Sequence, residues 1–97
     1  MPTWGKTDRF KADYAALSAE AQAKFLVAVG KLIEDLRRDG KIRSGLRVKG
    51  VQSAPGVHEM TWGGDGRATF EYGDPVVENE THIIWRRVGT HGIFGNP

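Results

Sequence analysis

The sequence predicts an α+β fold in which two amino-terminal helices pack on one face of a small antiparallel sheet. Apolar residues recur with the helical period as far as Gly40, and beyond it they fall in short runs separated by glycine and proline. Helices followed by strands are typical of α+β domains. The chain of 97 residues is too short for two hydrophobic cores, so we expect one domain spanning residues 1–97.

The helical half consists of a short segment and a long one. Phe10, Tyr14 and Leu17 lie at helical spacing, and Ser18 is a suitable N-cap for the helix that follows. Gly30 inside the long helix predicts a close neighbouring backbone, because glycine there costs about 1 kcal/mol relative to alanine. The long helix offers the core one apolar stripe, formed by Phe25, Leu26, Val29, Leu32, Ile33 and Leu36.

Short extended segments follow, joined by glycine-rich turns. The expected strands are residues 46–51, 57–62, 67–72 and 82–88, with 3–7 as a short edge strand. Residues 63–66, Gly-Gly-Asp-Gly, have the composition of a hairpin turn. Strand alternation then places Phe70 toward the helices and Arg67 on the opposite face of the sheet.

This second face is expected to be exposed and to gather a carboxylate, several cations and a histidine. Glu59 shares it with Arg67, and the last strand brings one of its two arginines before the chain reaches His91. The candidate residues are Glu59, Arg67 and His91 for catalysis, and Arg47, Lys49, Arg86, Arg87 and Phe94 for substrate binding. No metal-ligand pattern is present, so neither a metal ion nor another cofactor is expected.

These residue types suit the cleavage of RNA. A base must remove the proton of the 2′-hydroxyl, a task for Glu59 or His91, and Arg67 can hold the charge that develops on the phosphoryl oxygens. His91 can protonate the leaving 5′-oxygen, while Phe94 or Trp85 can stack on a base. The alternative for Glu59 and Arg67 is a simple cross-strand ion pair. A zinc site built from the three histidines matches no known ligand spacing.

Charge is concentrated in one segment of the chain. The net charge is only +2, but residues 37–49 carry six cations against Asp39 alone. This indicates a local anion-binding surface, although for Arg37 and Arg38 we favour the simpler role of satisfying a helix C-terminus and its dipole. The chain contains no cysteine, and no apolar stretch has the length of a membrane span or the character of a signal peptide. We therefore expect a cytoplasmic protein that does not associate with membranes.

Several motifs together resemble the RelE/ParE superfamily of bacterial type II toxin–antitoxin toxins, in its RelE/YafQ/HigB-like branch. They are Leu-Arg-Val-Lys at 46–49, Pro-Gly-Val-x-Glu at 55–59, Gly-Arg at 66–67 and Arg-Val-Gly-Thr-His at 87–91. The last is the most specific, since it resembles the ending of YafQ-like members, whose histidine is catalytic. The resemblance covers nearly the whole chain and implies the same arrangement of helices and sheet, which is similar to that of microbial RNases.

The resemblance also implies a function. RNase members of this superfamily are growth-inhibiting mRNA interferases, which cleave mRNA on the ribosome without a metal ion, contact rRNA there and are neutralised by a cognate antitoxin protein. It implies that His91 is catalytic with Phe94 nearby, that Arg67 contacts phosphate, and that Glu59 belongs to the site. Two alternatives remain: a ParE-like toxin that inhibits DNA gyrase without nuclease activity, and a non-catalytic phage or accessory binding protein of the same fold.

Overall fold

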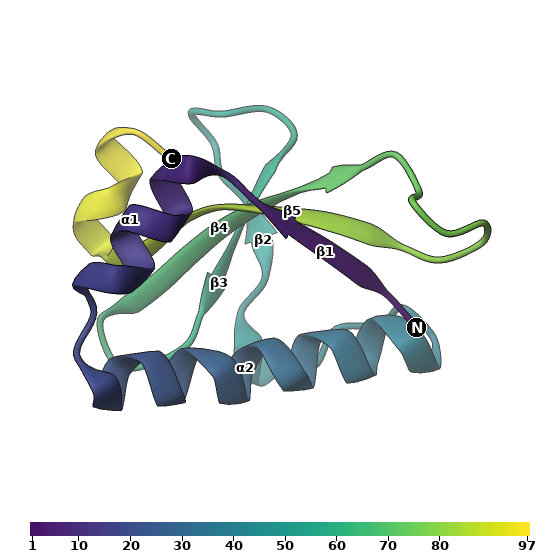
Figure 1. Ribbon diagram of the computed structural model, residues 1–97, viewed down its shortest axis with the longest axis horizontal. Coiled ribbons are helices and arrows are strands. Elements are labelled where there is room, and N and C mark those ends of the chain that lie inside the picture. The colour runs from purple at the N-terminus through teal and green to yellow at the C-terminus, as the bar shows by residue number, and fades with distance from the viewer.

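The computed structural model describes all 97 residues as two helices packed against a five-stranded sheet (Figure 1). The helices are α1 (Asp8–Ala16) and α2 (Ala19–Arg38). The strands are β1 (Thr3–Lys6), β2 (Lys49–Gly50), β3 (Val57–Thr61), β4 (Gly66–Gly73) and β5 (His82–Thr90). Two short 3₁₀ helices, η1 (Ser44–Leu46) and η2 (His91–Gly95), precede β2 and follow β5. The α+β class predicted from the sequence is confirmed.

The sheet is mixed, whereas the sequence predicts an antiparallel one. Its strand order is β1-β5-β4-β3-β2, and the pairs β2–β3, β3–β4 and β4–β5 are antiparallel. β1 lies at the edge, as expected, but it runs parallel to β5, with Thr3 opposite His82. Thr7 links the end of β1 to β5 just before α1 begins. The N–H of Thr7 donates to the carbonyl of Trp85 at 3.0 Å, and the hydroxyl of Thr7 donates to the carbonyl of Arg86 at 3.0 Å.

Both helices begin at hydroxyl caps. Thr7 Oγ1 accepts the N–H of Phe10 at 3.1 Å, and Ser18 Oγ accepts that of Ala21 at 3.1 Å, so each satisfies a donor that has no partner inside the helix. Gly40, at a φ of +76°, follows the end of α2 as predicted. The expectation for Gly30 is wrong, since a β-carbon there would meet no atom within 4 Å. Neither helix is long and apolar enough to cross a membrane.

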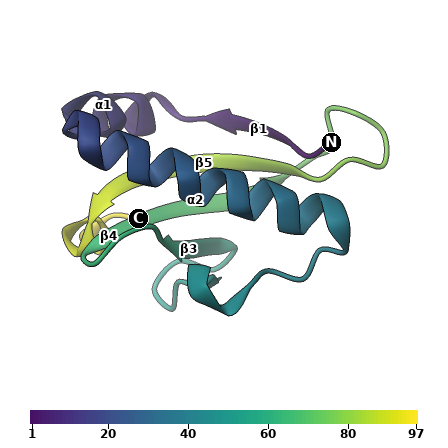
Figure 2. The ribbon, with the colours of Figure 1, turned by 90° about the horizontal axis from the view of Figure 1, so that it is seen from below.

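The hydrophobic core lies between α2 and one face of the sheet, across which the helix runs (Figure 2). Phe25 and Leu32 of α2 are fully buried, and so are Phe70 of β4 and Trp85 of β5. The rings of Phe25 and Trp85 meet edge to face at 5.2 Å. The predicted stripe of α2 is wrong only at Leu26, whose side chain is 49% exposed. With Phe70 turned toward α2, alternation leaves the other face of β4 for Arg67, as predicted.

Candidate active site

The candidate active site lies on the face of the sheet away from α2, which we call the open face. One row of paired residues crosses it from β2 to β5, because Glu59 lies opposite both Lys49 and Thr69, and Thr69 lies opposite Arg87. The residues on this face that carry charge or hydrogen-bonding groups are Lys49, Glu59, Thr61, Arg67, Thr69, Glu71, Arg86 and Arg87. The face therefore gathers most of the side chains that the sequence singles out.

A bulge places both arginines of β5 on the open face. Thr69 pairs with Arg87, but the next residue of β4, Phe70, pairs with Trp85, so Arg86 is an extra residue in β5. Such a bulge leaves two consecutive side chains on one side of the strand. In agreement, Arg86 Nε and Thr69 Oγ1 both donate to the carbonyl oxygen of Pro97, at 3.1 and 3.2 Å. The sequence predicts one of these two arginines on the open face, and the structure has both of them there.

Carboxylates hold these two arginines in fixed positions. Arg87 Nε donates to Asp13 Oδ2 of α1 at 2.6 Å, and its Nη2 reaches the other oxygen at 3.3 Å. Arg86 Nη1 donates to Glu71 Oε2 at 3.2 Å. Arg87 also donates to the carbonyl of Asn96 at 2.9 Å. Each guanidinium is therefore shared between one carboxylate and one main-chain oxygen of the carboxyl-terminal segment.

The carboxyl-terminal segment 91–97 covers part of the open face. Ile93 in η2 is buried. Its side chain packs close to Gly89 of β5, because a β-carbon built on Gly89 would lie 3.0 Å from it. Figure 1 shows this segment (yellow) across the sheet from α2, and its helix η2 contacts β4 and β5. Thr69 is fully buried beneath it. The sequence predicts an uncovered face here, and this expectation is wrong at the centre of the sheet.

Glu59 and Arg67 do not form the ion pair that was the plain alternative. Glu59 lies instead beside Lys49, with Nζ and Oε1 3.9 Å apart, and its side chain is only 15% exposed. Arg67 Nη1 donates to the carbonyl oxygens of Gly64 and Gly66, at 3.3 and 2.9 Å. Arg67 is therefore fastened to the β3–β4 turn, and the carboxylate of Glu59 has its own cation.

The end of the β3–β4 hairpin lies next to His91. Gly66 pairs with Thr90, the residue before His91, and Arg67 pairs with Gly89. The imidazole is exposed, and its ring meets that of Phe94 edge to face at 5.0 Å. The structure thus brings an arginine, a histidine and an aromatic ring to one end of the sheet, as the resemblance implies.

Trp62 fixes this hairpin, a part of the site that the sequence does not reveal. Its indole N–H donates to the carbonyl of Arg67 at 3.0 Å. A β-carbon at position 66 would come within 2.5 Å of the indole, so the ring takes the space that only glycine leaves. Strand alternation assigns Trp62 to the core strand 57–62, and only the Gly-Arg pair at 66–67 hints at this contact.

The remaining predicted residues lie apart from this cluster. The side chain of Arg47 forms no hydrogen bond or ion pair; the residue is exposed and ends η1 in a left-handed conformation with a φ of 50°. His58 stacks on Phe70 on the helix side at 5.5 Å, and His82 Nδ1 bonds to Thr3 Oγ1 at 2.7 Å. The three histidines therefore do not form the zinc site considered above.

Arg43, in the cationic segment 37–49, forms an ion pair with the buried carboxylate of Asp35. Asp35 of α2 is fully buried and accepts three bonds from Arg43, from its backbone N at 3.0 Å, its Nε at 2.9 Å and its Nη2 at 2.8 Å. These hydrogen bonds hold the pKa of Asp35 well below its usual range and raise that of Arg43. The signal in the sequence is an acid at helical spacing from Leu32, where an apolar residue is expected.

Comparison with known proteins supports the fold but not the sequence family. No protein-family model matches the chain, and no curated protein matches it in sequence. A chain of the crystal structure of the E. coli DinJ–YafQ complex is 15% identical, with a TM-score of 0.64 over 95% of this chain and 96% of that one. A chain of the intact E. coli RelBE toxin–antitoxin complex is 10% identical, with a TM-score of 0.63 over 93% of this chain and 96% of that one. A chain of the RelB–RelE complex from Methanococcus jannaschii is 15% identical, with a TM-score of 0.61 over 95% of this chain and 95% of that one.

These structures share the architecture of the chain over nearly its whole length. The chain therefore has the fold of the RelE and YafQ toxins, which is the fold that the resemblance predicts. At identities this low the comparison shows the fold alone. The function has to be argued from the residues on the open face.

Proposed function

We propose that the chain is the toxin of a type II toxin–antitoxin pair and that it cleaves mRNA on the ribosome without a metal ion. The observation that carries the proposal is the pairing of Gly66 with Thr90, which sets Arg67 beside the start of η2 and its exposed His91. An arginine and an imidazole are the groups that metal-free phosphodiester cleavage needs. The shared fold with RelE and YafQ toxins supports the same proposal.

The reaction uses the 2′-hydroxyl of the RNA as nucleophile. A base takes the proton of this hydroxyl, the 2′-oxygen bonds to phosphorus, and the bond to the 5′-oxygen breaks with that oxygen taking a proton. Arg67 stabilises the charge on the phosphoryl oxygens, and His91 gives the proton to the 5′-oxygen. Phe94, in contact with His91, stacks on a base next to the scissile bond.

Two groups are candidates for the base. Glu59 is a partly buried carboxylate beside Lys49, on the strand next to Arg67. A carboxylate oxygen of Glu59 can accept the proton of the 2′-hydroxyl. His91 is the alternative, in which case one imidazole first takes and then returns the proton. We favour the first arrangement, in which Glu59 is the base, because it leaves His91 free to act as the acid.

Arg86 and Arg87 bind the phosphates that flank the cleaved one. Both donate to main-chain oxygens, of Pro97 and Asn96 respectively. Phosphate oxygens can replace these carbonyls as acceptors once residues 96–97 move aside, and charge-assisted bonds to phosphate are the stronger ones. Lys49, exposed at the edge of the sheet, and Arg47 extend this cationic surface.

The partner of the chain is a small cognate antitoxin, acidic or of helix-turn-helix type, which covers the cationic face. Solved structures of the same fold include the DinJ–YafQ and RelB–RelE complexes. A protein that covers Arg67 and His91 removes the anion site and the proton donor together. Co-purification of the chain with the product of a neighbouring gene would support this pairing, and a free monomer from co-expression would contradict it.

Primer extension on mRNA in a programmed translation mixture tests the proposal. We expect cuts within the codon in the ribosomal A site with the wild-type chain and with Asp8→Ala, a control at a fully exposed position of α1. We expect no cuts with His91→Ala. Cuts that persist in His91→Ala would remove His91 from the mechanism. Intact mRNA with every variant would overturn the nuclease assignment, and induction of DNA damage in cells would then point to gyrase.

A further inference from the structure

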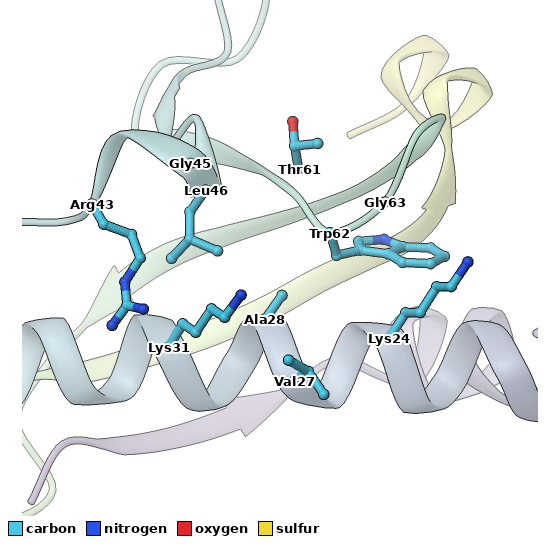
Figure 3. Close-up of a pocket in the computed structure, with 10 residues that line it drawn as sticks. All are labelled: Lys24, Val27, Ala28, Lys31, Arg43, Gly45, Leu46, Thr61, Trp62 and Gly63. Atoms are coloured by element: carbon cyan, nitrogen blue, oxygen red, sulfur yellow. The ribbon is translucent and has the colours of Figure 1, made fainter.

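A second cationic pocket lies on the helix side of the sheet, between α2, η1 and the beginning of the β3–β4 turn (Figure 3). Its volume is about 340 Å³. The residues that line it are Lys24, Val27, Ala28, Lys31, Arg43, Gly45, Leu46, Thr61, Trp62 and Gly63. Three of them are cations and none is an acid, although Asp35 and Glu34, outside the lining, lie 2.8 and 3.8 Å from Nη2 of Arg43.

Arg43 is fixed at one end of this pocket. Its Nε and Nη2 are bonded to the buried Asp35, at 2.9 and 2.8 Å, so the guanidinium cannot turn away. Its Nη1 donates no hydrogen bond within the chain. An arginine that is held by a buried carboxylate and keeps free donors is preorganised to bind an anion, because little side-chain entropy remains to be lost.

Two lysines of α2 supply the other cations. Lys24 and Lys31 are two turns apart on the helix, and Figure 3 shows both extending from α2 on the side of Leu46 and Trp62. Lys31 forms no ion pair, and Lys24 has only Glu20 at 3.3 Å, with both side chains largely exposed. Such exposed pairs are weak, so both ammonium groups are available to a ligand.

An aromatic wall distinguishes this pocket from a plain cationic surface. The indole of Trp62 lines it and is held in place by its hydrogen bond to the carbonyl of Arg67. Leu46 and Ala28 add apolar surface beside the ring. A ligand that carries both a planar ring and negative charge matches this combination.

We propose that this pocket binds one nucleotide of a single-stranded RNA, with phosphate oxygens at Lys31 and Arg43 and the base against Trp62. The volume is within the range of small-ligand sites. An acidic peptide would satisfy the cations but would leave the aromatic wall unused. The choice of RNA rests on the proposed function. The turn that carries Trp62 leads into β4 and Arg67, so that an RNA strand on the candidate active site can continue around residues 62–66.

Binding is measured by fluorescence anisotropy with a short fluorescein-labelled single-stranded RNA and the full chain carrying His91→Ala, which leaves the probe uncut. Lys24→Gln and Lys31→Gln together are expected to weaken binding roughly tenfold or more and to lower the salt slope by about 0.7 for each phosphate that is no longer neutralised. Lys41→Gln is the matched control. It removes one charge from an exposed lysine of the cationic segment that does not line the pocket, and we expect less than about a twofold change.

Competition identifies the source of the ligand. We expect unlabelled RNA to displace the probe, and adenosine 5′-monophosphate or polyglutamate to do so only at much higher concentrations. Displacement by polyglutamate as readily as by RNA would overturn the proposal in favour of an acidic protein partner. Equal displacement by the mononucleotide would overturn the strand as the source. An equal loss of affinity in Lys41→Gln would overturn the pocket as the binding site.

The proposed function can fail separately. If mRNA stays intact with the wild-type chain while RNA binding still depends on Lys31, the nuclease assignment fails and the binding pocket stands. If mRNA is cut but the double lysine variant binds RNA as tightly as its parent, the pocket fails and the nuclease stands.

Discussion

Gly66 lies so close to the indole ring of Trp62 that a β-carbon at position 66 would come within 2.5 Å of it. Trp62 in turn holds the carbonyl of Arg67, and Gly66 pairs with the residue before His91. The contact between Gly66 and Trp62 therefore controls the geometry of the hairpin end on which the candidate active site depends.

Gly66→Ala is expected to destabilise the fold and to reduce cleavage together. The methyl group must displace the indole, and overpacking of this kind costs about 1–3 kcal/mol. Chemical denaturation and the primer-extension assay measure the two effects. Gly64→Ala is the control, because a β-carbon there meets no atom within 4 Å, and we expect it to change stability by no more than about 0.5 kcal/mol. Equal stability of the two variants would show that the ring moves freely.

Arg67 is expected to matter for cleavage more than for stability. Arg67→Ala should lower the rate of mRNA cleavage by about 10²–10³-fold, as the loss of one group that stabilises a developing oxyanion does. Arg67→Lys should recover only part of this, since an ammonium lacks the forked geometry. Single-turnover cleavage, together with thermal unfolding, separates the two effects. A variant that unfolds at the wild-type temperature and cuts at the wild-type rate would exclude Arg67 from the site.

Asp13→Ala tests the link between α1 and β5. Asp13 and Arg87 are mostly buried, with side-chain exposures of 18% and 16%, and Asp13 also accepts the N–H of Val88 at 3.3 Å. Its loss leaves both donors without their acceptor, which should cost about 1–3 kcal/mol. Asp8→Ala on the same helix is the control, since Asp8 is fully exposed and lies 3.7 Å from the exposed Lys11. A similar loss of stability in both variants would contradict a specific role for Asp13.

The pair of Asp35 and Arg43 predicts a dependence of stability on pH. The pKa of Asp35 is lowered in the folded chain by its hydrogen bonds to Arg43, from an ordinary value of 3.8. The folded state thus favours the ionised form, and the stabilisation is complete well above pH 3.8 and is lost as the pH falls below it toward the lowered pKa. Asp35→Asn leaves the donors of Arg43 facing a neutral amide at a fully buried position, so it should lower the unfolding temperature by roughly 5–10 °C at pH 7.

Thermal unfolding between pH 7 and pH 2 measures how the stability contributed by the Asp35–Arg43 pair depends on pH. The difference between the wild-type chain and Asp35→Asn should be constant near neutrality and should narrow at acidic pH. Glu34→Gln is the control, because Glu34 is exposed and lies 3.8 Å from the same arginine. A difference that stays constant down to pH 2 would mean that the carboxylate of Asp35 is not the source of the stabilisation.

The sequence predicts the helices and their caps well because these signals are local. Ser18 caps α2, and Gly40 follows its end, as the spacing indicates. The alternation in β3 and β4 likewise places Glu59 and Arg67 on one face, because strand period alone decides it. Local patterns therefore carry both the fold class and the choice of face.

Features that depend on distant residues are not predictable in this way. The parallel pairing of β1 with β5 joins the two ends of the chain, and nothing near Thr3 specifies it. The bulge at Arg86 is set by the register against Thr69, and the burial of Asp35 depends on a bond to Arg43 across the end of α2. Apolar periodicity does not report such contacts, so the partners of the arginines emerge only from the structure.

The pairing of β1 with β5 also has a consequence for the timing of folding. Residues 3–6 find their strand partner only in residues 82–85, so the sheet of a nascent chain stays open while most of the chain is being synthesised. His91 directly follows β5, at the beginning of η2. A chain that lacks residues 82–85 therefore lacks both the partner strand of β1 and the segment that carries His91, so on the proposed function it has neither the complete sheet nor the proton donor.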